Sequence, residues 1–447
     1  MGSIATYVAT GLVDGLEDTF FDGIRRFPPA SNMRLTLDGA HTTPFWDLPG
    51  RAAVLRASLN GASGAPWSAL RQALDEAVRV HLRSDVPLGV CLSGGLDSSA
   101  IVGLASRYVE RVKTFTIYFD DGPEYDERPH AHAAIERFRA DGAERVVTPT
   151  DLADELRRIV WHLDEPSLAL GVYPHWQVMS LAHEAGVKVV LDGQGGDEVF
   201  AGYTNYASQH LYGLLGSRPM HFAGEALALG RVQGWQQARS AARSAVAMRL
   251  RRAAAPSVDR KPDAALLAPE LRRMADVSHD EWRLWPRVFD GWLSNVLYWE
   301  LSRTRLPALL RYEDRLSMAF SIESRVPFLD HRLVELAFAL PDEVKRRAGW
   351  SKYGLRRALQ DLLPASIVWR RDKKGFPTPV GKWLRDARGA TALRVLRDPA
   401  RRSRSLFPQP AVDALVDDHV QGRADHSWQL WRALSTELWL EAFELAA

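Results

Sequence analysis

The stretch that decides the fold is Leu92-Ser-Gly-Gly-Leu-Asp-Ser-Ser99, which follows an apolar run and opens a segment with helical periodicity. Its two glycines let the backbone approach a ligand closely. Its serine hydroxyls, its backbone amides and the start of the helix form a cradle for an anion such as pyrophosphate. The spacing is not that of a Walker A loop, which needs Gly-Lys-Ser/Thr after four spacer residues. The residues assigned to ATP and pyrophosphate here are Leu92, Ser93, Gly94, Gly95, Asp97, Ser98 and Ser99.

Strand-like and helical segments alternate around this loop. The predicted strands are 86–92, 112–119, 145–148 and 187–191, and the predicted helices between them are 98–108, 127–139, 151–163 and 172–185. Short strands that are apolar throughout and separated by helices indicate an α/β fold, in which helices cover both faces of a parallel sheet. Strand signals fade from about residue 200, so the C-terminal half is predicted to be mostly helical. Within it, the spacing of Trp428, Trp431, Leu434 and Leu438 predicts a buried helix face.

A second glycine-rich loop follows the strand predicted at 187–191. It contains Gly193, Gly195 and Asp197, and the last lies 100 residues after Asp97. Because ligands of open α/β sheets bind at the carboxyl ends of the strands, we expect the two aspartates to face one site. Carboxylates and phosphate oxygens are suitable ligands for Mg²⁺, which would separate Asp97 from bare phosphate. Asp97 and Asp197 are therefore the predicted metal ligands.

Four ordered motifs, the last of them in two segments, resemble a known family. Ser93–Ser98 resembles the PP-loop of ATP pyrophosphatases, which adenylate a substrate and release pyrophosphate. Further segments resemble the asparagine synthetase class, whose relatives include β-lactam synthetases and lasso-peptide cyclases. The resemblance covers roughly residues 60–447, and its further segments are 191–203, 306–330, 352–356 and 371–376.

The resemblance implies an ATP- and Mg²⁺-dependent ligase that adenylates a carboxylate and transfers the acyl group to ammonia or an amine. It implies that Thr116 and Ile117 flank the adenine. It also makes Lys373 and Glu323 catalytic, since an ammonium at Lys373 would stabilise the α-phosphate and the oxyanion. The alternatives are a surface lysine at 373 and an ordinary ion pair between Glu323 and Arg325. For Lys352, structural and functional roles remain equally open.

The acceptor region is expected around Asp164 and Glu165, which match a loop of the family, and around Asp314 and Arg315. These four are candidate substrate-binding residues. The alternatives are a simple helix exit before Pro166 and a structural charge network.

The N-terminal region resembles only the tail of a glutaminase domain. We predict a remnant and linker at 1–60 and a synthetase domain at 61–447, with a PP-loop core at about 61–205 and a helical part at about 206–447. Glutamine-dependent relatives carry a cysteine as second residue, whereas position 2 here is Gly2 and the one cysteine, Cys91, lies in the strand before the PP-loop. The nitrogen is therefore expected to be free ammonia, an amine, or ammonia from a separate glutaminase or amine-carrier protein.

The amino-acid composition narrows the range of possible partners and substrates. Lys+Arg totals 57 against 55 Asp+Glu, a net charge of +2, which does not favour a nucleic-acid partner and counts against a PP-loop tRNA-modifying enzyme. The intact candidate residues count against a non-catalytic nucleotide-binding protein. A single cysteine fits the cytoplasm, and no apolar stretch is long enough for a membrane span. The expected substrate is a small-molecule or peptide carboxylate. Aspartate is the default of the class, and specialised amide formation in natural product biosynthesis is the other expectation.

Overall fold

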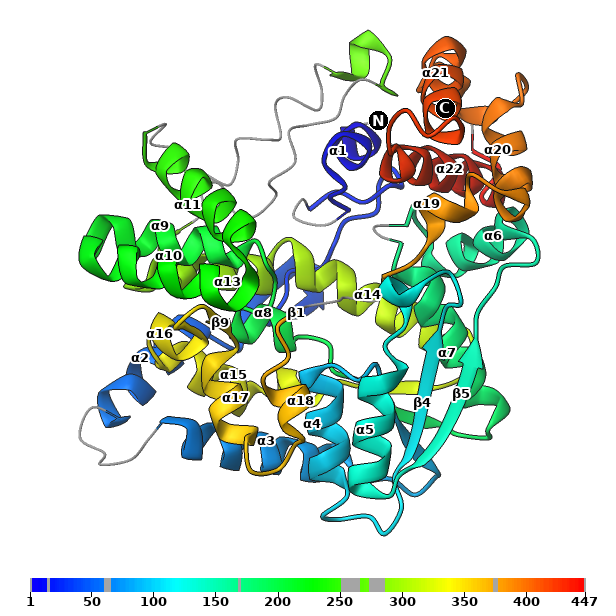
Figure 1. The fold of residues 1–447 in the computed structure, drawn as a ribbon. Coiled ribbons are helices and arrows are strands. Elements are labelled where there is room, and N and C mark those ends of the chain that lie inside the picture. The colour runs from blue at the N-terminus through cyan, green and yellow to red at the C-terminus, as the bar shows by residue number, and fades with distance from the viewer. Residues whose placement is uncertain are drawn as a thin grey trace.

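The computed structural model describes residues 2–13, 17–59, 66–167, 170–250, 266–272, 286–372 and 377–445. Within these residues, a central sheet of five strands has the order β5-β4-β3-β6-β7, and every neighbouring pair is parallel (Figure 1). The α/β fold with a parallel sheet is thus confirmed. The strands are β3 (Leu88–Cys91), β4 (Lys113–Tyr118), β5 (Asp141–Val146), β6 (Val189–Leu191) and β7 (Glu323–Arg325).

The edge strands differ most from the sequence prediction. β5 starts at Asp141, four residues before the predicted strand, because most of its side chains are exposed and polar and give no apolar signal. β7 was not predicted, since only three residues pair with β6 and none of them is apolar. It comes from the C-terminal half, so the sheet is not confined to the PP-loop core predicted at about 61–205. The predicted domain boundary near residue 60 lies outside the described residues.

Strand order places the functional loops side by side. The chain runs from β3 outward to β4 and β5, then returns to add β6 on the other side of β3. The direction of the strand order therefore reverses between β3 and β6, which is where ligands bind in open α/β sheets. The loops that follow these two neighbouring strands begin at the same edge of the sheet.

Helices cover both faces of the sheet, as expected. Val90 of β3 packs into a core formed with α3, α4, α5 and α15, whereas its neighbour Cys91 packs with Val178 and Met179 of α7. This alternation follows from the opposite directions of successive side chains in a strand. The helices that enclose the sheet are α3 (Pro66–His81), α4 (Leu96–Ala105), α5 (Arg128–Phe138), α6 (Leu152–Leu163), α7 (Val172–Glu184), α8 (Gly196–Phe200), α15 (His331–Ala339) and α17 (Tyr353–Leu359).

The C-terminal half is mostly helical, as predicted. α9, α10 and α11 pack together through small apolar residues, and α22 packs among α1, α6, α20 and α21 (Figure 1). The remaining described helices of this half are α9 (Tyr206–Ser217), α10 (Pro219–Gln233), α11 (Trp235–Leu250), α13 (Trp292–Ser302), α14 (Arg305–Met318), α16 (Asp342–Lys345), α18 (Ala365–Val368), α19 (Val380–Trp383), α20 (Ala390–Arg397), α21 (Gln409–Val420) and α22 (Ser427–Ala442). Two short strands, β8 (Arg346–Arg347) and β9 (Trp350–Ser351), also belong to this half. Short 3₁₀ turns lie at Pro327–Leu329, Ala387–Gly389 and Arg402–Ser405, and one more lies in the first half at Pro123–Tyr125.

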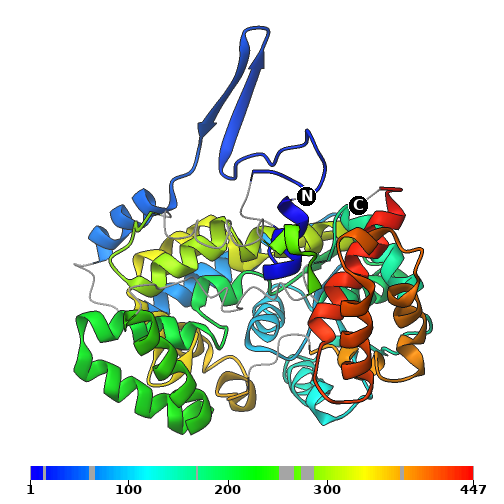
Figure 2. The same ribbon diagram turned by 90° about the horizontal axis from the view of Figure 1, so that it is seen from above.

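The N-terminal region has two unlike parts. Helix α1 (Gly2–Thr10) is almost wholly buried, and the hydroxyl of Tyr7 donates a hydrogen bond to the carbonyl of Ser167 at 2.6 Å. The hairpin β1 (Ser31–Thr36) and β2 (Gly39–Pro44) projects away from the body of the protein, and α2 (Leu48–Leu59) follows it (Figure 2). No helix of the described residues is long and apolar enough to cross a membrane.

We predict that Leu74→Ala, in the buried face of α3, lowers the free energy of unfolding by about 2–5 kcal/mol, because it leaves a cavity between α3 and the sheet. Gln72→Ala on the exposed face of the same helix should change it by less than ~0.5 kcal/mol. Urea denaturation measures both values. Equal effects of the two substitutions would contradict the packing described for α3.

Candidate active site

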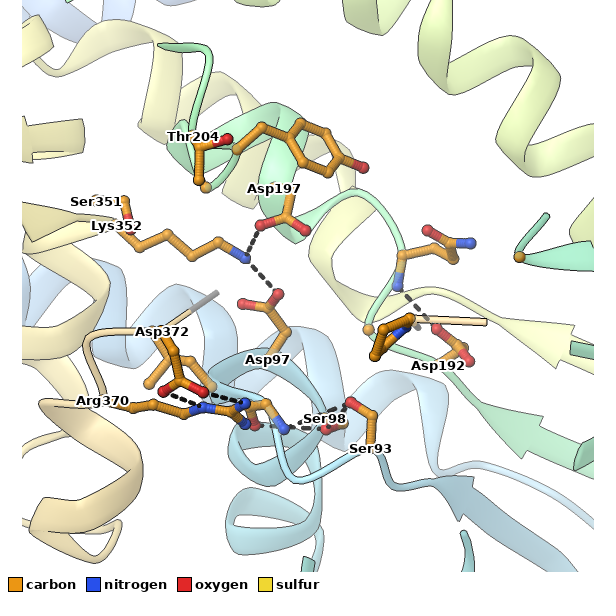
Figure 3. Close-up of a pocket in the computed structure, with 18 of the residues that line it drawn as sticks. Ser93, Asp97, Ser98, Asp192, Asp197, Thr204, Ser351, Lys352, Arg370 and Asp372 are labelled. Atoms are coloured by element: carbon orange, nitrogen blue, oxygen red, sulfur yellow. Dashed lines mark hydrogen bonds and ion pairs between the residues drawn. The ribbon is translucent and has the colours of Figure 1, made fainter. Parts of the chain in front are cut away.

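A cavity of about 910 Å³ lies at the carboxyl ends of β3 and β6. Both glycine-rich loops open into it, and residues 350–352 and 370–372 form another part of its wall (Figure 3). Of the residues assigned to ATP and pyrophosphate, those that line the cavity are Leu92, Ser93, Gly95, Asp97, Ser98, Ile117 and Gly193.

The first loop is shaped by its glycines. Gly94 has a φ of +74°, and a Cβ there would lie 2.6 Å from the backbone nitrogen of Ala131 in α5, so only glycine fits. The hydroxyls of Ser93 and Ser98 lie 3.2 Å apart. Helix α4 begins at Leu96, two residues before the predicted start, which points its amino end at the cavity. The loop therefore has the form of an anion cradle.

The other assigned residues do not line the cavity but support its wall. They are Gly94, Ser99, Thr116 and Gly195. Thr116, for example, donates a hydrogen bond from its hydroxyl to the carbonyl of Leu92 at 2.8 Å. This bond ties β4 to the start of the loop. The predicted adenine contact of Thr116 stays a prediction.

Asp97 and Asp197 face each other across a single ammonium group. Lys352 Nζ contacts Asp97 Oδ2 and lies 2.6 Å from Asp197 Oδ1 (Figure 3). Lys352 is only 4% exposed and adopts a left-handed backbone conformation at the start of α17. Gly202 is required beside them, because a Cβ there would overlap both the Asp197 carboxylate and the Lys352 side chain.

This arrangement fits a metal ion. Asp97 Oδ1 is buried and accepts no hydrogen bond within the described part of the chain. Two carboxylates that already surround a cation, with one oxygen still available, are the donor set that Mg²⁺ prefers together with phosphate oxygens. Lys352 provides the positive charge that keeps the carboxylates together.

Of the two residues predicted to be catalytic, Glu323 lies away from this cavity. Lys373 lies outside the described residues. Glu323 pairs with Val189 at the amino-terminal end of β6, away from the cavity, and its side chain is 61% exposed. Its carboxylate lies 2.7 Å from Arg325, which is the ion pair that the sequence left as the alternative.

Three of the four candidate substrate-binding residues are engaged with one another or with nearby charges. Asp164 forms an ion pair of 2.6 Å with Arg315, and Glu165 contacts both Arg26 and Arg311. Neither these three predicted residues nor the exposed Asp314 is among the described residues that line the cavity. Their placement favours the structural charge network over direct substrate contact.

A buried cluster of titratable residues was missed by the sequence analysis. His175 of α7, Asp192 after β6 and Glu313 of α14 place one ligand atom each within 4.8 Å of the others. His175 Nε2 lies 3.2 Å from Glu313 Oε2. His175 and Asp192 line the cavity. No spacing rule joins residues from three separate elements, and the one available signal was Asp192 inside the second glycine-rich segment.

The cluster shifts the pKa of each member. Burial, and then the nearby Glu313 carboxylate, raise the pKa of Asp192 to about 7. Burial lowers the pKa of His175, but the charge of Glu313, the hydrogen bond to Glu313 and the charge of Asp192 together outweigh burial, and the pKa is raised. Burial likewise opposes the charge of Glu313, yet His175 and a hydrogen bond of 2.5 Å from Ser324 hold its pKa below the usual value. The pair is therefore charged, beside an aspartate that titrates near neutrality.

The structure gives one aromatic residue, Trp428, a different role from the predicted one. Trp431, Leu434 and Leu438 of α22 are buried in the core, as predicted. Trp428, at the start of the same stripe, is half-buried and lines the cavity. The helical spacing therefore predicted correctly which face of α22 is buried. It was wrong for Trp428, which lines the cavity instead of packing in the core.

Strand order and the position of the glycine-rich loop are those of PP-loop nucleotide-binding proteins. Comparison with known families is more specific: residues 69–441 match asparagine synthase, and the chain belongs to that family. It is 31% identical over 440 residues to a putative glutamine-hydrolysing asparagine synthetase of Mycobacterium tuberculosis. That alignment covers 95% of this chain and 65% of the relative. The chain is also 29% identical over 382 residues to glutamine-hydrolysing asparagine synthetase 1 of Bacillus subtilis. That alignment covers 83% of this chain and 58% of the relative.

A fungal relative has a different name. The chain is 27% identical over 417 residues to amidase chry2 of Gibberella zeae, which covers 82% of this chain and 60% of the relative. The chain thus spans roughly three fifths of the length of these relatives. Residues 69–441 of this chain correspond to the synthetase part of these relatives.

We predict that Lys352→Met makes the protein respond to magnesium. Removing the ammonium leaves two buried carboxylates unpaired, which should lower the free energy of unfolding by about 3–5 kcal/mol. Added Mg²⁺ should restore part of it, so that Tm rises with Mg²⁺ concentration and falls again with EDTA.

The matched control is Lys345→Met, which removes another buried lysine whose hydrogen bonds go to Leu340 and Ser294 rather than to paired aspartates. Its Tm should not respond to Mg²⁺. The same Mg²⁺ response in both variants would contradict a cation site between Asp97 and Asp197.

Proposed function

We propose that this protein is an ATP-dependent, AMP-forming carbon–nitrogen ligase. It adenylates a carboxylate, releases pyrophosphate and transfers the acyl group to ammonia or an amine. The observation that supports this most is the meeting of Asp97, Asp197 and the phosphate cradle in one cavity, at the switch point of the sheet. Membership in the asparagine synthase family supports the same chemistry.

Each side chain has a role in the first half-reaction. The β- and γ-phosphates bind in the cradle formed by Ser93 to Ser98 and the amino end of α4. Asp97 and Asp197 hold Mg²⁺, which compensates the charge of the phosphates when it is bound. Lys352 keeps the two carboxylates in place. Lys373 remains our candidate for stabilising the α-phosphate and the oxyanion.

The acid is either aspartate or a larger carboxylate. Apolar and aromatic side chains line part of the cavity, and among them are Tyr125, Leu170, Val178 and Trp428. Such a wall suits an acid with more apolar surface than aspartate. On the basis of this wall we favour specialised amide formation, as in natural product biosynthesis. Asparagine formation from aspartate is the alternative within the same mechanism.

The nitrogen is proposed to come from free ammonia, an amine substrate, or a separate glutaminase or amine-carrier protein. The one cysteine in the chain, Cys91, is buried at the end of β3, and burial raises the pKa of its thiol well above the usual value. A protonated, buried thiol is a poor nucleophile. Cys91 is therefore assigned to packing and not to glutamine hydrolysis.

We predict that Asp97→Asn and Asp197→Asn each abolish ATP–pyrophosphate exchange. Losing a carboxylate removes a metal ligand and the charge that compensates the phosphates. Aspartate and larger acids should be compared as substrates. Asp290→Asn, which changes a carboxylate whose side chain is 95% exposed, is the control and should exchange normally. Normal exchange in either site variant would disprove its role as a metal ligand.

We also predict that the purified chain releases no glutamate from glutamine, because its single thiol is buried. Measurement of glutamate in the presence and absence of ATP and Mg²⁺ tests this. Ammonia or an added amine should be required for AMP to accumulate together with an amide product. Glutamate release that survives Cys91→Ala would reveal a different nucleophile, and release that Cys91→Ala removes would overturn the packing role.

A further inference from the structure

Asp192 stands apart from the other carboxylates of the cavity. Asp97 and Asp197 share the ammonium of Lys352, whereas Asp192 has no lysine or arginine ion pair among the described residues. It lies directly after β6, and its Oδ1 accepts a hydrogen bond of 3.0 Å from the backbone amide of Gln194 (Figure 3). Its carboxylate also lines the cavity into which the phosphate cradle opens.

The second half-reaction needs a group of this kind. When an amine attacks an acyl-adenylate, the nitrogen must lose a proton as the new bond forms, and a side chain that is ionised at neutral pH and close to the acyl group can accept it. The phosphate cradle and the Asp97–Asp197 pair serve the first half-reaction. The negative charge of the two aspartates is already compensated by Lys352. The other carboxylate of the described cavity wall outside that set, Asp372, is paired with Arg370, whereas Asp192 lies beside His175.

We infer that Asp192 accepts the proton of the attacking nitrogen, and that the His175–Glu313 ion pair is a positioning pair that holds Asp192 ready. This inference rests on the proposed function, since it concerns the acyl-transfer step of that reaction. It assigns the nucleophile to the class of neutral amines, ammonia included, that bind beside Asp192.

The step balances without any further reactant. The nitrogen lone pair forms the C–N bond to the acyl carbon, and the π electrons of the carbonyl move to its oxygen. One N–H proton passes to Asp192 Oδ2, and that N–H electron pair stays on nitrogen. When the carbonyl re-forms, the bond between the acyl carbon and the phosphate oxygen breaks, and AMP leaves with that electron pair. The products are the amide, AMP and a protonated Asp192, which returns its proton to solvent.

The surroundings of Asp192 explain why it can act near neutral pH. The groups that face it are the Cys91 thiol at the end of β3, His175 of α7, and Glu313 with its neighbour Tyr312 on α14. Burial and Glu313 raise the pKa of Asp192 to about 7, while His175 and hydrogen bonds from Gln194 and Cys91 limit the rise. Asp192 is therefore a carboxylate above about pH 7 and a carboxylic acid below it, so acyl transfer should fall as the pH drops through 7.

Asp192→Asn separates the two half-reactions. With aspartate, ammonia, ATP and Mg²⁺, ATP–pyrophosphate exchange should persist while amide formation falls by about 100-fold or more, the usual contribution of a general base. Asp290→Asn should change neither rate. Loss of exchange to the same degree as amide formation would overturn the inference, because Asp192 would then belong to adenylation. Absence of exchange in the unaltered protein would count against aspartate as the acid of the proposed function instead.

A measurement without substrate tests the same assignment. Protein labelled with ¹³C at the aspartate carboxyl carbons should show one resonance that titrates near pH 7, and Asp192→Asn should remove it. His175→Gln should move that titration to higher pH, because it removes a positive charge beside the carboxylate. If no resonance titrating between about pH 6 and 8 disappears in Asp192→Asn, the inference is wrong whatever the substrate is.

Discussion

The structure depends on holding two buried aspartates side by side at the reversal of the strand order. Asp97 and Asp197 follow β3 and β6, which are neighbours in the sheet although they are 100 residues apart in sequence. Two carboxylates so close would repel each other strongly, and the ammonium of Lys352 relieves that repulsion. Lys352 comes from a third region of the chain, the start of α17. The sheet, the helical half and the cavity are thus joined at one electrostatic contact.

The carboxylates near the cavity differ in how they are compensated, and this difference separates their roles. Glu165 contacts two arginines, one of which belongs to the N-terminal segment, so it acts as a structural link. Asp97 and Asp197 share one lysine, which leaves an oxygen for a metal ion. Among the described residues, His175 is the cationic side chain that faces Asp192, and that histidine is engaged with Glu313. With so little compensation, burial and the neighbouring Glu313 raise the pKa of Asp192 to about 7.

The sequence predicted the parallel sheet, both glycine-rich loops and the convergence of Asp97 with Asp197, because these follow from local apolar runs and from strand order. It did not predict β7, since three polar residues carry no periodic signal. Glu323 was placed in the site from its motif, but the register of β7 puts it at the opposite end of the strand. The cluster around Asp192 was missed because tertiary packing alone brings α7, β6 and α14 together.

The central claim is that a carboxylate is activated as an acyl-adenylate in this cavity. Transfer of ¹⁸O from a labelled carboxylate tests it most directly, with aspartate first and larger acids next. After turnover with ATP, Mg²⁺ and ammonia, ³¹P NMR should find the label in the phosphate of AMP, because the attacking carboxylate oxygen remains on phosphorus when the amide forms. Label in inorganic phosphate, together with ADP, would show an acyl phosphate instead and would contradict the account.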